Sequence, residues 1–148
     1  MKTRVLLMTS FFALTIIAAG QTVQAQQVML VDIPFNFVAG GATLPAGEYA
    51  VGRSATNDGV LLLKQQDNPR ASAMIPTFAA QRLEPKSKPT LVFHRYGDRY
   101  FLSQVWTAGQ IRGRQLMRSA SEKEIVKLAK VETKGEVTLE ARVSPAKR

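Results

Sequence analysis

The sequence predicts an all-β fold: a small antiparallel β-barrel or sandwich of about seven or eight strands, with one short helix near residues 120–130. Apolar and polar residues alternate over short runs, turn residues recur at intervals of roughly ten residues, and a helical pattern occurs once. Both faces of several predicted strands carry apolar side chains, which favours a partly closed barrel.

The first strand is predicted in the segment VMLVDIPFNFV, residues 28–38. Apolar and polar side chains alternate there with the period of a half-buried strand. Pro34 cannot donate a hydrogen bond to a ladder, so it indicates an edge position or a bulge. The residues predicted to share one face are Val31, Ile33, Phe35 and Phe37, and those on the other face are Asp32, Pro34 and Asn36.

Turn residues divide the following segment into further strands. Pro45 presets φ in the turn Leu44-Pro45-Ala46-Gly47, where Gly47 can adopt a left-handed backbone. Further turns are predicted at Gly40-Gly41, Asn57-Asp58-Gly59 and Asn68-Pro69, with strands beginning at Tyr49 and spanning residues 60–64 and 71–78, and an exposed connection over residues 81–90.

The segment LVFHRYGDRYFLSQVW, residues 91–106, predicts a β-hairpin. If Gly97-Asp98 is a two-residue loop, glycine at its first position suits a type II′ turn, and a longer loop would shift the register. His94 then lies beside Phe101 on the less apolar face, and Trp106 lies on the core face. The expected pairs are Arg95 with Tyr100, Phe93 with Leu102, Leu91 with Gln104, Tyr96 with Arg99, His94 with Phe101 and Val92 with Ser103.

A single helix is predicted in SASEKEIVKLAK, residues 119–130. Ser119 with Glu122, or Ser121 with Glu124, fits a capping box at its start. After it, a turn at Lys134-Gly135 leads into a last strand that alternates at Val137, Leu139 and Ala141.

The N-terminus predicts export. Residues 1–25 match a secretory signal peptide, with basic Lys2 and Arg4, an uncharged apolar run too short to span a membrane, and Val23-Gln24-Ala25 before the cleavage site. We therefore expect a single β-rich domain over residues 26–148, periplasmic or secreted, with no transmembrane segment after cleavage. The sequence has no Cys and so no disulfide or thiolate metal site.

Three segments together resemble a family of small exported bacterial proteins of unknown function. They are VDIPFNFVAGGATLPAGEYAV, LVFHRYGDRYFLSQVWTAGQIRGR and SASEKE. The resemblance covers most of the chain after the signal peptide, up to about Lys130. It implies export and a β-rich fold, and it implies no activity and no site residues.

The sequence predicts no enzyme, catalytic residue, cofactor or metal. His94, Ser103 and Asp98 are the residue types of a nucleophilic triad, but adjacency within one hairpin is not triad geometry. One His without Cys gives no zinc signature, and the turn at residues 56–60 lacks the acidic ligands of a calcium loop.

Positive charge is concentrated in the middle of the chain. Removal of Lys2 and Arg4 lowers the formal net charge from +9 to +7, and residues 81–118 alone carry eight basic and two acidic side chains. Such asymmetry predicts anionic partners, which for an exported protein are envelope lipids or glycans rather than nucleic acid. The predicted anion-binding residues are Arg95, Arg99, Arg112 and Arg114.

We therefore expect an exported, non-enzymatic β-domain with a binding or structural role in the cell envelope, docking on anionic surfaces. A hydrolase acting on polysaccharide or peptide is one alternative, for which Asp32, Glu48 and Asp98 are the candidate carboxylates. A small apolar-ligand-binding barrel is the other, and an internal cavity of about 300 Å³ or more would favour it. Its predicted lining is Phe35, Phe37, Phe93, Tyr100, Leu102 and Trp106.

Overall fold

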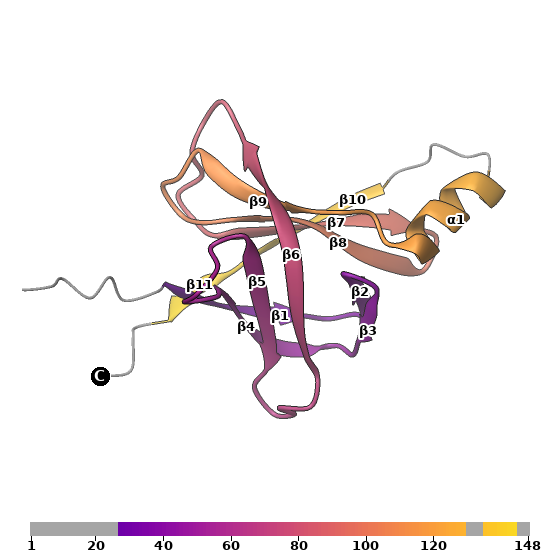
Figure 1. Cartoon of the computed structure of the whole chain (residues 1–148), viewed down its shortest axis with the longest axis horizontal. Helices are drawn as coiled ribbons and strands as arrows, with labels where there is room; N and C mark the ends of the chain where they lie inside the picture. The colour runs from indigo at the N-terminus through magenta and orange to yellow at the C-terminus, as the bar shows by residue number, and fades with distance from the viewer. Residues whose placement is uncertain (1–26, 130–134, 145–148) are drawn as a thin grey trace, which may run out of the picture.

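Eleven strands and one helix follow one another in the computed structural model, which describes residues 27–129 and 135–144 (Figure 1). The predicted signal peptide lies outside the described residues. The elements are β1 Val28–Ile33, β2 Phe37–Ala39, β3 Ala42–Leu44, β4 Gly47–Arg53, β5 Val60–Gln65, β6 Ser72–Gln81, β7 Thr90–Tyr96, β8 Arg99–Trp106, β9 Arg112–Leu116, α1 Ala120–Ala129, β10 Gly135–Glu140 and β11 Arg142–Ser144.

The strands form one mixed sheet that bends into two layers. Hydrogen bonds connect them in the order β10-β7-β8-β9-β6-β5-β4-β1-β11, and β2 pairs with both β3 and β8. One layer contains β7, β8, β9 and β10, the other contains β1, β4 and β5, and β6 runs from one to the other (Figure 1). The first half of β6 pairs with β5 as far as Pro76, and the second half pairs with β9 from Thr77 onward. Strands that change layer in this way form the corners of such folds.

The all-β prediction with one short helix is confirmed, and the strand number and the purely antiparallel pairing need correction. There are eleven strands in the described residues, and β2 runs parallel to β8. The pattern over residues 28–38 predicts one strand, but β1 ends before Pro34, the chain bends at Phe35, and it continues as β2 against the other layer. The sheet is not closed by a ladder, although its two end strands, β10 and β11, are consecutive in the chain and meet at buried Ala141.

Aromatic side chains fill the interior between the layers. Phe37 packs edge-to-face on Tyr49 and on Phe93, with ring centroids 5.3 and 5.5 Å apart. Phe35 stacks on Tyr100 with centroids 3.8 Å apart. Such pairs add to the hydrophobic stabilisation from burial. Four of the six residues predicted to line an apolar cavity therefore pack against one another in the core.

The turn before β4 depends on glycine. Gly47 has a φ of 149°, and a Cβ at this position would collide with the side-chain amide of Gln65. That amide is buried and donates to the carbonyl oxygen of Ala46 at 3.1 Å. The predicted turn therefore holds β4 against the end of β5.

The hairpin prediction is confirmed at its loop and wrong at its far end. Gly97 has a φ of 60°, and Tyr96 pairs with Arg99, as a two-residue loop requires. A bulge lies between Val92 and Phe93, where the pairing register shifts. The pairs beyond it are Leu91 with Val105, Val92 with Gln104 and Thr90 with Trp106.

Because of this bulge, Val105 enters the core and Trp106 lies outside it, contrary to the predicted face. Trp106 is nevertheless buried. The guanidinium of Arg82 lies 3.7 Å from the centre of its ring, and a Cβ on Gly113 would collide with the indole. The indole N–H donates to Gln104 Oε1 at 3.1 Å. Trp106 is thus packed between an arginine and a glycine, outside the main core cluster.

Helix α1 begins at the first of the two predicted caps. Ser119 Oγ accepts a hydrogen bond from the backbone N–H of Glu122 at 3.2 Å, as an N-cap serine does. The Glu122 side chain turns toward the tip of the β7–β8 hairpin, beside which α1 lies (Figure 1). In the described part of the chain, α1 is too short and too polar to cross a membrane.

Candidate functional site

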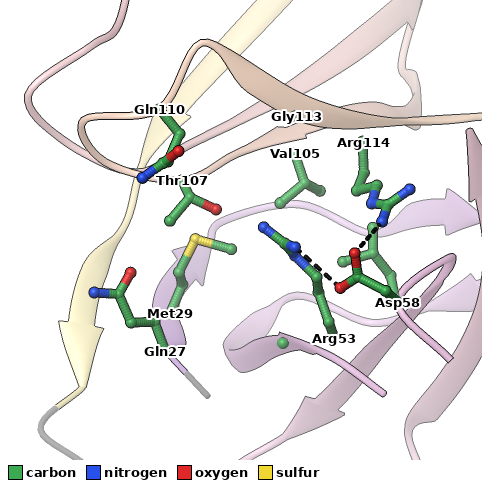
Figure 2. Close-up of a pocket in the computed structure, with 11 residues that line it drawn as sticks. Gln27, Met29, Arg53, Asp58, Val105, Thr107, Gln110, Gly113 and Arg114 are labelled. Carbon is green, nitrogen blue, oxygen red and sulfur yellow. Dashed lines mark hydrogen bonds and ion pairs between the residues drawn. The ribbon is translucent and has the colours of Figure 1, made fainter. Parts of the chain in front are cut away.

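A cavity of about 550 Å³ lies between the two layers, at the end of β8 away from the hairpin loop. This volume is in the range of small-molecule sites. Its apolar wall comes from both layers: Met29 on β1, Leu61 on β5 and Val105 on β8. Gln27, Thr107 and Gln110 add polar groups on one side (Figure 2).

Two arginines share one carboxylate on the opposite side of the cavity (Figure 2). Asp58 Oδ1 accepts from Arg53 Nη1 at 3.0 Å, and Asp58 Oδ2 accepts from Arg114 Nη2 at 2.7 Å. The hydrogen bond from Arg53, and then the charges of Arg53 and Arg114, hold the pKa of the Asp58 carboxyl below its ordinary value. The carboxylate is therefore ionised at neutral pH, and the three side chains together carry one net positive charge.

Strand geometry directs Arg114 into the cavity. On β9, Arg114 lies on the same face as Leu116, and it pairs with Val105 of β8 on one side and Ala79 of β6 on the other. Its side chain is 18% exposed. A guanidinium carries five N–H donors, and among the described residues Arg114 has only Asp58 as a hydrogen-bond partner.

A tight turn between β4 and β5 presents Asp58. Asn57 Oδ1 accepts from the backbone N–H of Gly59 at 2.9 Å, and the Asn57 carbonyl accepts from Val60 at 3.0 Å. The Gly59 carbonyl accepts from both the backbone N–H and the hydroxyl of Thr77 at 2.8 Å, which ties the turn to β6. Asp58 itself is at the tip, and its side chain is 71% exposed.

The structure places the four predicted arginines in two separate pairs. Arg95 and Arg99 are exposed at the hairpin tip, whereas Arg112 and Arg114 lie on β9 near the other end of β8. Val105, the partner of Arg114, lies six positions after Arg99 on β8, which is about 20 Å of strand. Only Arg114 lines the cavity.

A second polar cluster holds α1 to the hairpin. Glu122 Oε1 lies 2.8 Å from His94 Nδ1 and accepts from the Tyr96 hydroxyl at 3.1 Å, and Arg118 Nε is 4.0 Å away. The Glu122 side chain is only 5% exposed. Burial, together with the nearby Glu122 carboxylate, raises the pKa of Tyr96. The cluster satisfies a buried carboxylate and serves to position the helix.

The candidate catalytic and metal-ligating residues do not form a site. Ser103 is buried within β8, His94 faces Glu122, and Asp98 lies in the exposed hairpin loop. Asp32 pairs with Glu48 across β1 and β4, outside the cavity. Within residues 27–129 and 135–144, no three His, Asp or Glu side chains are grouped so that they could hold a metal ion.

The sequence patterns do not predict Arg53 and Asp58 as partners of Arg114, or Glu122 as the partner of His94. The pattern Arg-x-x-x-x-Asp across a predicted turn is a signal for the Arg53–Asp58 pair, since a tight turn brings strand ends together. The contacts of Asp58 with Arg114 and of Glu122 with His94 depend on how the layers and the helix pack.

Comparisons of the chain with family models, curated proteins and solved structures give no match. The resemblance to small exported bacterial proteins stays a prediction.

Proposed function

We propose that residues 26–148 form an exported, non-enzymatic β-domain that binds a small amphipathic anion in the cavity between its two layers. The observation that carries this proposal is Arg114. Its guanidinium is mostly buried, lines the cavity and has one described partner for its five donors.

The cavity wall indicates the class of ligand. A planar guanidinium binds a carboxylate or phosphate through two parallel hydrogen bonds. Met29, Leu61 and Val105 provide apolar surface for the rest of the molecule. A short acyl or alkyl chain with one anionic head group suits both features. The aromatic core lies away from the cavity, so the ligand chain contacts aliphatic side chains.

Docking of the protein on an anionic envelope surface stays a prediction. The four arginines that this docking would use lie in two separate pairs at different ends of β8. Their positive charge is therefore divided between two places: Arg95 with Arg99, and Arg112 with Arg114. The cavity therefore supports binding of a soluble amphipathic anion better than docking of the protein on a membrane surface.

Titration with hexanoate tests the proposal, with hexyl phosphate as the second anionic probe and hexanol as the neutral one. We expect saturable binding of both anions and weaker binding of hexanol. Arg114→Gln should weaken hexanoate binding by about ten-fold or more, because a hydrogen-bonded charge pair is lost. The matched control is Arg112→Gln, which removes the same charge from the same strand outside the cavity.

Calorimetry or NMR titration gives these affinities. Equal losses of hexanoate affinity in the Arg114 and Arg112 variants would mean that the effect comes from net charge alone. That result would contradict the proposal. Binding of hexanol as tight as that of hexanoate would contradict it as well.

A further inference from the structure

We infer that Asp58 is an internal competitor for the ligand, a carboxylate that occupies Arg114 in the empty cavity and that the anionic head group must replace. This inference rests on the proposed function and adds the residue that sets its affinity and its preference for anions. It starts from the two contacts of Asp58, which differ in kind.

The contact with Arg53 is local. Five residues separate Arg53 from Asp58, and both belong to the β4–β5 hairpin. The contact with Arg114 is long-range, over 56 residues, and joins the turn of one layer to β9 of the other. The two contacts use different oxygens of Asp58, Oδ1 for Arg53 and Oδ2 for Arg114 (Figure 2), so Asp58 can leave Arg114 and keep Arg53.

Asp58 is the partner that yields more easily. Its side chain is 71% exposed, whereas that of Arg114 is 18% exposed and fixed on a strand paired on both sides. Ion pairs with an exposed partner contribute little free energy, typically below about 1 kcal/mol. Thr77 holds the carbonyl of Gly59, the next residue, so the exchange that we infer is a movement of the Asp58 side chain on an anchored backbone.

The geometry of the contact also allows an anionic ligand to replace Asp58 on the Arg114 guanidinium. Asp58 uses one oxygen on one nitrogen, Nη2. A free carboxylate or phosphate can use two oxygens on two nitrogens of the guanidinium, which is the stronger arrangement. A neutral ligand forms no charge-assisted pair with Arg114 that could replace the contact of Asp58. Asp58 therefore disfavours the binding of uncharged molecules of the same shape.

The test compares Asp58→Asn with the wild-type chain and with Asp67→Asn. Asp67 is exposed on the β5–β6 turn, so its variant changes the net charge equally and does not alter the cavity. We expect Asp58→Asn to bind hexanoate about two- to five-fold more tightly, the range that corresponds to the free energy of an exposed ion pair. Asp67→Asn should bind as the wild type does.

Two further measurements make the result specific. In the double variant Asp58→Asn/Arg114→Gln the gain in hexanoate affinity should vanish, because it depends on an Arg114 that no longer pairs with Asp58. In the wild type, the pKa of the Asp58 carboxyl, followed by NMR, should rise when hexanoate saturates the cavity, because Asp58 then loses one of its two cationic partners.

The outcomes separate the inference from the proposed function. Wild-type binding in the cavity without a gain in Asp58→Asn, or with an equal gain in Asp67→Asn, would overturn the competitor and leave the proposed function standing. Binding detected in Asp58→Asn alone would support both. If hexanoate and hexyl phosphate bind neither protein, the proposed function is overturned and the competitor with it.

Discussion

An acidic side chain held by basic or hydroxyl groups lies near each end of β8: Glu122 of α1 at the hairpin end, and Asp58 of the β4–β5 turn at the cavity end. At the hairpin end, Glu122 is buried, and His94 and Tyr96 converge on one of its oxygens. At the cavity end, Asp58 is exposed and divides its two oxygens between two arginines.

This difference separates an acid that holds the structure from one that is available for exchange. A buried carboxylate whose donors are removed leaves unsatisfied polar groups, so its contacts persist. An exposed carboxylate can be replaced by water or by another anion at little cost. Burial and the number of converging donors, rather than the presence of an ion pair, therefore decide which cluster is a candidate site.

The largest effect should come from the buried Trp106 on β8. Trp106→Ala should lower the free energy of unfolding by about 3–5 kcal/mol, because a large buried ring is lost from between Arg82 and Gly113. Phe78→Ala, at an exposed aromatic on β6, should cost less than about 1 kcal/mol. Denaturant melts measure both. Similar losses in the two variants would show that Trp106 is not held as described.

Changes in the two clusters should have opposite effects on stability and on hexanoate affinity. Glu122→Ala should cost about 2–4 kcal/mol of stability and leave hexanoate affinity unchanged, because it breaks the buried cluster and does not touch the cavity. Arg114→Gln should cost less than about 1 kcal/mol and weaken binding. Glu124→Ala, an exposed change on the same helix, is the control for helix propensity.

The contrast fails if Glu122→Ala weakens hexanoate binding as much as Arg114→Gln does. It also fails if Arg114→Gln unfolds the protein, since Arg114 would then be part of the structural framework.

The smallest effect concerns acid stability. Because the folded-state pKa of Asp58 is below its ordinary value, its ion pairs contribute fully above about pH 4 and are lost as the pH falls through the lower folded-state value. The stability difference between wild type and Asp58→Asn should therefore be present at neutral pH and vanish in acid. Thermal melts at a series of pH values check this, and a difference that grows in acid would contradict it.

Local patterns in the sequence predict the elements that neighbouring residues determine. The Gly97-Asp98 loop fixes the pairing from Tyr96 with Arg99 as far as Phe93 with Leu102, and Ser119 caps α1. Beyond that point one extra residue in β8 shifts the register, and no composition signal marks it. This single bulge moves Val105 into the core and Trp106 out of it.

The candidate site depends on contacts that a local pattern does not contain. Asp58 and Arg114 meet because β6 carries the chain from the layer of β5 to the layer of β9. The four arginines are close in sequence, yet the length of β8 keeps two of them at each end. Charge counting therefore includes Arg114 among the predicted anion-binding residues, but it cannot supply the partners of Arg114 in the folded chain.

Mapping of hexanoate binding on the backbone amides tests the central claim most directly, because it locates the ligand on one end of β8 or the other. The cavity account predicts that the largest saturable shifts occur at Gly52, Thr107 and Gly113, which line the cavity. The amides around Gly97 at the hairpin tip should not respond. Shifts centred on Gly97, with none at the cavity residues, would contradict the account.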